Sequence, residues 1–115
     1  MAEPLRVELV YDPDCPNVER ARAAIRTALS TVGAPAVWRE WDRGDPATLQ
    51  VLRSLGSPSV LVNGLDVGAD GGAIAEASAN SCRVYTDSHG RPCGAPTAEM
   101  ILMTIAAARR GQAIA

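Results

Sequence analysis

The chain is predicted to be an α/β domain with a four-stranded mixed sheet, and three observations support this class. Residues 6–11 alternate apolar and polar side chains, which predicts a strand. Residues 18–32 carry apolar side chains at helical spacing. Residues 59–67 hold two short apolar runs on either side of Asn63-Gly64, a pair that favours a tight hairpin turn. A strand–helix–strand beginning followed by a hairpin is typical of an α/β fold.

The middle of the chain adds a strand and a helix to this pattern. Residues 36–41 are predicted to form the second strand, which the first helix would join to the first strand by a right-handed connection. Asp45 and Pro46 combine a capping residue with a proline suited to the first helical turn, so a second helix is predicted to start there and to end at Gly56. Its buried side would consist of Leu49, Leu52 and Leu55.

The last part of the chain is predicted to hold an irregular segment and a helix. Residues 68–96 form an irregular loop or lid segment that contains two cysteines. Within it, residues 82–85 can form a short strand that turns back through residues 87–90. Thr97 is the predicted N-cap of the last helix, which would end near Arg110. The predicted order is therefore β-α-β-α-β-β, the irregular segment and α.

Composition narrows the class of protein. The 115 residues fit one domain, and a net charge of −2 with a pI near 5.3 argues against a nucleic-acid surface. No apolar run is long enough for a membrane span, and the first residues do not read as a secretory signal. We therefore expect a cytoplasmic protein, in which cysteines are more often catalytic or metal-binding than paired in disulfides.

The most informative residue is Cys15, which lies between the first strand and the first helix. Backbone N–H groups and the dipole at a helix N-terminus stabilise an anion there. A cysteine in that setting favours its thiolate, the form that acts as a nucleophile or metal ligand. Asp14 is the predicted N-cap of this helix. The alternative is that Cys15 is a small buried hydrophobic residue.

These features together resemble a known family. A cysteine after the first strand and a proline before the third strand are similar to the thioredoxin-like fold. More narrowly, the chain resembles small single-domain thioredoxin-like proteins of GC-rich bacteria that are often labelled alkylmercury-lyase-like. The matching residues are Tyr11, Cys15-Pro16-Asn17, Gly56-Ser57-Pro58-Ser59, Cys82-Arg83-Val84-Tyr85 and Gly94-Ala95-Pro96. The resemblance implies a cis peptide bond at Pro58, packed beside Cys15.

The chain departs from this family at its redox motif. The family's Cys-x-x-Cys reads Cys15-Pro16-Asn17-Val18 here, so a dithiol cycle within the motif is impossible. One interpretation is a thiol protein in which Cys15 exchanges with a small thiol or disulfide or binds a thiophilic metal ion, with Cys82 or Cys93 as its partner. Another is an enzyme that cleaves an organomercurial substrate, with Asp12 or Asp14 as proton carrier. A third is a non-catalytic binding domain.

The candidate site follows from these interpretations. The predicted catalytic residues are Cys15, Cys82, Cys93 and Asp14. The same three cysteines are the predicted ligands of a soft metal ion such as mercury, since three sulfurs suffice for a trigonal site. The predicted substrate-binding residues are Tyr11, Pro16, Asn17, Ser57 and Pro58. We expect residues 68–81 to act as a lid that carries Cys82 over Cys15, and His89 to be an exposed turn residue.

Overall fold

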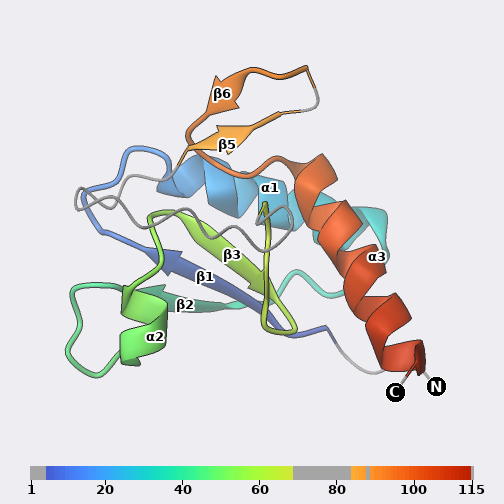
Figure 1. Ribbon diagram of the computed structural model, residues 1–115, viewed down its shortest axis with the longest axis horizontal. Coiled ribbons are helices and arrows are strands. Elements are labelled where there is room, and N and C mark those ends of the chain that lie inside the picture. The colour runs from blue at the N-terminus through green and yellow to red at the C-terminus, as the bar shows by residue number, and fades with distance from the viewer. Residues whose placement is uncertain (1–4, 69–83, 88, 115) are drawn as a thin grey trace.

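The chain folds into a mixed sheet with helices packed against it, as Figure 1 shows. This computed structural model describes residues 5–68, 84–87 and 89–114. The α/β class and the four-stranded mixed sheet predicted from the sequence are confirmed. No helix in the described part of the chain has the length and hydropathy that a membrane span needs.

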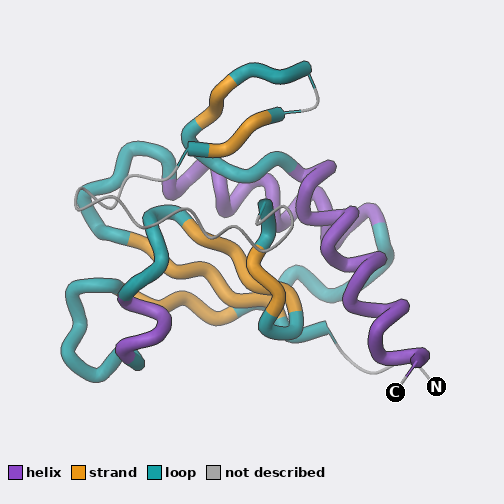
Figure 2. Tube along the Cα trace, in the orientation of Figure 1, coloured by secondary structure: helices purple, strands orange, loops and turns teal. Residues whose placement is uncertain are grey.

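Four strands form the main sheet in the order β2-β1-β3-β4, coloured orange in Figure 2. The central strand β1 (Val7–Tyr11) runs parallel to β2 (Arg39–Asp42) and antiparallel to β3 (Ser59–Val62). The edge strand β4 (Leu65–Asp66) returns antiparallel to β3. β1 and β2 can run parallel because the connection between them is long enough for the crossover that parallel neighbours need.

The turn between β3 and β4 has the predicted conformation. Asn63 has φ of 50° and Gly64 has φ of 84°. Positive φ at both central residues defines the type I′ turn, whose twist matches that of the flanking strands. The Asn63 side chain also accepts a hydrogen bond from the Arg6 backbone N–H at 2.8 Å, which ties the hairpin to the start of β1.

The main core lies between one face of the sheet and the two long helices. The helices are α1 (Val18–Thr31) and α3 (Ala98–Ile114). They pack against each other, and each also contacts strands of the sheet. The helical stripe predicted for α1 is buried, and the Thr97 hydroxyl caps α3 by accepting the Met100 backbone N–H at 3.1 Å. The largest enclosed side chains of this core are Leu9, Ile25, Leu29, Val60, Val62, Ile101 and Ile105.

A smaller cluster covers the opposite face of the sheet. Val10 of β1 is fully buried in it, with Leu55 and Leu61 as its other buried members. Trp41 packs against this cluster, whereas Trp38 packs against the main core, so the two rings lie on opposite sides of the sheet. The burial of β1 on both faces follows from these two clusters.

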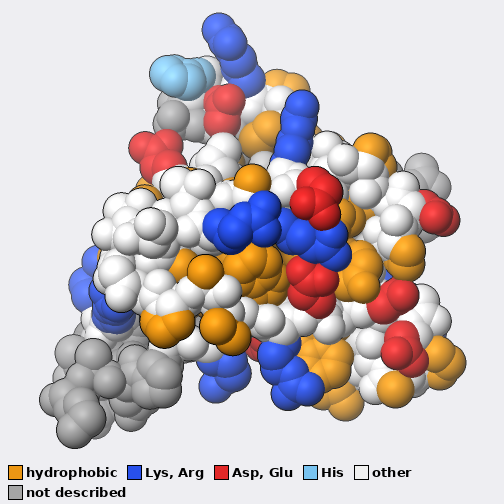
Figure 3. Space-filling view, turned by 180° about the vertical axis from the view of Figure 1, so that it is seen from behind, with side chains coloured by type: hydrophobic (Ala, Val, Ile, Leu, Met, Phe, Trp, Pro, Cys, Tyr) orange, Lys and Arg blue, Asp and Glu red, His pale blue; other side chains and the backbone are white. Residues whose placement is uncertain are grey.

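Arg22 connects α1 to the edge strand β2. Its guanidinium pairs with Glu40 at 2.8 Å and also contacts Glu19. The hydrogen bond from Arg22 holds the pKa of Glu40 below its usual value. Seen from behind in Figure 3, acidic and basic side chains are interspersed on this face.

The predicted boundaries of two central elements are wrong. The second strand is β2, which begins three residues later than the predicted range of 36–41. The second helix, α2 (Gln50–Arg53), begins at Gln50 and not at Asp45. The buried Thr48 donates its hydroxyl to the Asp42 carbonyl at 2.8 Å, and the residue after it is extended, so the chain forms a turn before the helix. Leu49 is consequently exposed, against prediction.

The segment predicted as irregular contains a hairpin. β5 (Tyr85–Thr86) pairs antiparallel with β6 (Pro92–Cys93). Between them the Asp87 carboxylate accepts backbone N–H groups of Arg91 and His89, each at 2.9 Å. The hydrogen bond from Arg91, and to a lesser extent that from His89, lowers the pKa of the Asp87 carboxyl. The turn signal at residues 87–90 was therefore sufficient to reverse the chain.

The last helix continues beyond its predicted end near Arg110. α3 runs to Ile114 and includes Gly111. Glycine inside a helix costs only about 1 kcal/mol relative to alanine, and none of residues 112–115 is a proline that would stop the helix. A glycine after two arginines is therefore too weak a signal to end it.

Ile105 and Met103 of α3 provide a test of this core. Ile105 is 1% exposed and Met103 is 68% exposed. We expect Ile105→Ala to lower the free energy of unfolding by about 2–5 kcal/mol, because it removes core contacts and leaves a cavity. Met103→Ala should change it by about 0.5 kcal/mol or less. Urea titrations followed by tryptophan fluorescence measure both, and equal losses would contradict the assigned core.

Candidate functional site

Cys15 lies in a hydrogen-bonded turn between β1 and α1. Its backbone N–H donates to the Asp12 carbonyl at 2.9 Å, and its carbonyl accepts the Val18 N–H at 3.5 Å. The side chain is half-buried and packs against the edge of the main core. This turn delays the first helical residue to Val18, so Asn17 holds the N-cap position. The prediction that Asp14 caps the helix is therefore wrong, and Asp14 is exposed.

Ser57 holds the Cys15 loop through two contacts. Its carbonyl lies 3.8 Å from the Cys15 sulfur, which donates to it through the thiol hydrogen. Its hydroxyl accepts the Asp12 backbone N–H at 2.9 Å. The Ser57–Pro58 peptide bond is cis, as the resemblance implies, and both residues are buried. Two predicted substrate-binding residues, Ser57 and Pro58, thus adjoin the predicted reactive sulfur.

Tyr85 approaches the neighbouring Pro58 carbonyl from the β5–β6 hairpin. The side chain is 3% exposed, and its hydroxyl donates to the Pro58 carbonyl. Its ring lies against Gly68, where an added Cβ would sit 2.7 Å from a ring carbon. We did not predict Tyr85 as a site residue. Its position in the matched Cys82-Arg83-Val84-Tyr85 motif is the signal that could have indicated it.

The other end of the hairpin contacts the start of α1. A Cβ added at Gly94 would collide with the Asn17 side chain, so the glycine allows the two segments to approach closely. Asn17 is a predicted substrate-binding residue two positions after Cys15. Cys93, next to Gly94, is half-buried and, like Cys15, a free thiol. The predicted lid spans residues 68–81, and all of it but Gly68 lies outside the described residues, as does Cys82.

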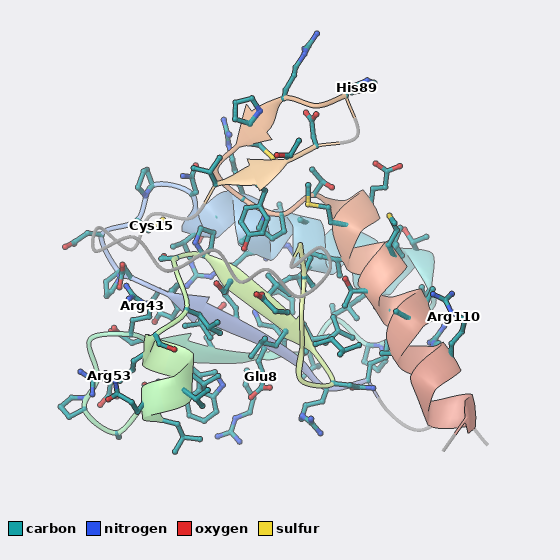
Figure 4. All side chains as sticks on the ribbon, viewed as in Figure 1. Glu8, Cys15, Arg43, Arg53, His89 and Arg110 are labelled. Carbon is teal, nitrogen blue, oxygen red and sulfur yellow. The ribbon has the colours of Figure 1, made fainter. Side chains whose placement is uncertain are left out.

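Asp12 is held by an arginine that the sequence analysis did not identify. One guanidinium nitrogen of Arg43 donates to both carboxylate oxygens of Asp12, at 2.7 and 2.9 Å. The other two nitrogens of that guanidinium donate to the Arg53 carbonyl, at 2.9 and 3.2 Å. Arg43 follows β2 directly, and its backbone N–H donates to the Tyr11 carbonyl at 2.8 Å. Figure 4 shows Cys15, Arg43 and Arg53 at the same end of the sheet.

The remaining predicted residues lie around this centre or away from it. Tyr11 is half-buried beside the main core, with the Arg22 guanidinium 5.6 Å from its ring centre. Pro16 is exposed in the turn after Cys15. His89 is exposed at the far tip of the β5–β6 hairpin, where Figure 4 labels it.

The metal-site prediction concerns three sulfurs, one of which is not described. Among the residues that the structure describes, no group of three His, Cys, Asp or Glu side chains gathers as a metal site would require. The predicted set of Cys15, Cys82 and Cys93 remains a prediction, since the placement of Cys82 is outside the described ranges. Soft thiolates are the ligands that such an ion would prefer.

Comparison with known proteins identifies no relative of this chain. No family model matches it, and neither a curated protein nor a solved structure does. The function must therefore be argued from the residues and contacts of the site.

Tyr85→Phe tests whether the hydrogen bond to the Pro58 carbonyl anchors the β5–β6 hairpin. The change deletes the hydroxyl and leaves the Pro58 carbonyl without that donor. We expect the free energy of unfolding to fall by about 1–3 kcal/mol, because a buried acceptor that loses its partner keeps the cost of desolvation. Chemical denaturation measures the loss. A variant as stable as the parent would show that the hydroxyl does not anchor the hairpin.

Proposed function

We propose that this chain is a thioredoxin-like thiol protein in which Cys15 exchanges with small disulfides. The observation that carries the proposal is the contact of the Cys15 sulfur with the carbonyl of the cis Ser57–Pro58 peptide bond. The order of the sheet, with a parallel β1–β2 pair and an antiparallel β3 beside it, supports the thioredoxin-like assignment. Cys15 lies in the loop after β1, where that resemblance puts the reactive cysteine.

The reaction needs only one protein sulfur for its first step. The Cys15 thiol loses its proton to solvent, and the thiolate attacks one sulfur of a small disulfide. A bond forms between Cys15 and that sulfur, the original sulfur–sulfur bond breaks, and the second half leaves as a thiolate. The product is a mixed disulfide on Cys15, and a small thiol reverses the step in the same way.

The surroundings of Cys15 suit a small substrate. Cys15 is half-buried, so the accessible surface of this residue is limited. Ser57 and Pro58 supply a backbone wall on one side, and Asn17 lies two residues after Cys15 in the turn that leads into α1. Cys93 and Cys82 are the candidates for a second thiol that would displace the substrate from Cys15. Nothing in this first step requires either of them.

Glutathione disulfide is a direct probe of this proposal. We expect the reduced protein to gain one glutathione adduct, and peptide mapping by mass spectrometry to find it on Cys15. Cys15→Ser should abolish this adduct. Cys93→Ser is the matched control, because it removes another half-buried free thiol and should still allow the adduct to form on Cys15. Modification of Cys93 in preference to Cys15 would refute the proposed role.

A thiophilic ion is the other ligand that the same sulfur can take. Cleavage of an organomercurial would require an acid near the metal-bound carbon as well as the sulfur. The Asp12 carboxylate is engaged by Arg43, and Asp14 is an exposed turn residue. We therefore favour binding over cleavage for such compounds.

Phenylmercury separates these outcomes. We expect intact-mass analysis of the reduced protein to find phenylmercury attached, with its phenyl group retained, and Cys15→Ser to weaken the attachment. In cleavage a proton would add to the phenyl carbon as the carbon–mercury bond breaks, benzene would leave, and the protein would keep the added mass of mercury alone. Detection of that product, dependent on Cys15, would replace the exchange proposal with organomercurial lysis.

A further inference from the structure

We infer that Arg43 is a positioning residue for Cys15, acting through Asp12, an inference that rests on the proposed exchange function. Arg43 does not contact the sulfur in any hydrogen bond of the described residues, so its influence must pass through the chain. Asp12 is the residue through which it passes. Its carboxylate binds Arg43, while its backbone groups bind the Cys15 loop and Ser57.

The Asp12 backbone forms hydrogen bonds with both Cys15 and Ser57. Its carbonyl accepts the Cys15 N–H at 2.9 Å, and its N–H donates to the Ser57 hydroxyl at 2.9 Å. Ser57 in turn presents its carbonyl to the Cys15 sulfur. A shift of Asp12 therefore moves both the residue that bears the sulfur and the residue that faces it.

Arg43 fixes Asp12 because its own guanidinium is held by hydrogen bonds from each of its nitrogens. All three of its nitrogens donate hydrogen bonds, one to the Asp12 carboxylate and two to the Arg53 carbonyl. The Arg43 side chain is 16% exposed and that of Asp12 is 32% exposed, so water screens the pair only in part. Arg53 returns a bond to the Arg43 carbonyl at 3.2 Å. The end of α2 thus braces the arginine against the Cys15 loop.

The planar guanidinium is essential to this bracing. Lysine carries the same charge on a single ammonium nitrogen, which does not reproduce a fork that binds two acceptors in fixed directions. Both reactions are in-line displacements by the Cys15 sulfur, but glutathione disulfide is large and must fit beside the Cys15 loop as it reacts, whereas iodoacetamide is small and makes fewer demands on the position of that loop. A positioning residue should therefore affect exchange more than alkylation.

The experiment compares these two reactions at Cys15. Rates with glutathione disulfide and with iodoacetamide are measured for the parent protein, Arg43→Lys, Arg43→Gln, Asp12→Asn and the double variant Asp12→Asn/Arg43→Gln. We expect the ratio of exchange to alkylation to fall about tenfold in Arg43→Gln and Asp12→Asn, since small misplacements of reacting groups are costly. Arg43→Lys should recover only part of the ratio, and the double variant should match the single ones.

Controls separate positioning from loss of stability. Arg26→Gln alters an exposed arginine of α1 and should leave the ratio unchanged. Simple loosening of the fold would raise the rates of exchange and alkylation at Cys15 together, and also the rate of alkylation at Cys93. The ratio of exchange to alkylation at Cys15 would then stay unchanged in Arg43→Gln and Asp12→Asn, and that result would overturn the inference. Additive losses in the double variant would also overturn it, because they would mean that Arg43 acts independently of Asp12. Absence of exchange at Cys15 in the parent protein would refute the proposed function instead.

Discussion

The site depends on the burial of β1 in the centre of the sheet. Leu9 and Val10 are both 0% exposed and face opposite clusters, so the strand cannot shift without disrupting both faces. β2 runs parallel to β1 and β3 runs antiparallel to it. The C-terminal ends of β1 and β2 and the N-terminal end of β3 therefore lie at the same end of the sheet. The Cys15 loop, Arg43 and Ser57 come from these three places, which is why they are neighbours in space.

Much of this arrangement could be predicted from short-range patterns in the sequence. The α1 stripe, the type I′ turn at Asn63-Gly64 and the Thr97 cap are local signals, and each formed as predicted. The position of Cys15 between the first strand and the first helix follows from the same patterns. Such features depend on spacing and backbone geometry within a few residues.

The parts that were missed depend on contacts between distant residues. Arg43 pairs with Asp12 across 31 positions, and the Tyr85 hydroxyl reaches Pro58 across 27. The exposure of Leu49 results from the bond of Thr48 to Asp42, which replaces the first turn of the predicted helix. A single sequence offers little to indicate such pairings, although Asp12 and Arg43 follow neighbouring strands that the β-α-β pattern predicts to be parallel.

The contact of Gly68 with the Tyr85 ring brings two points of the chain together at the site. Gly68 has φ of 84°, a backbone conformation that favours glycine, and an added Cβ would sit 2.7 Å from a carbon of the Tyr85 ring. A side chain at position 68 would therefore displace the ring, and with it the hydroxyl that donates to the Pro58 carbonyl. Glycine at this position is thus a condition for the support that Tyr85 gives to the residues beside Cys15.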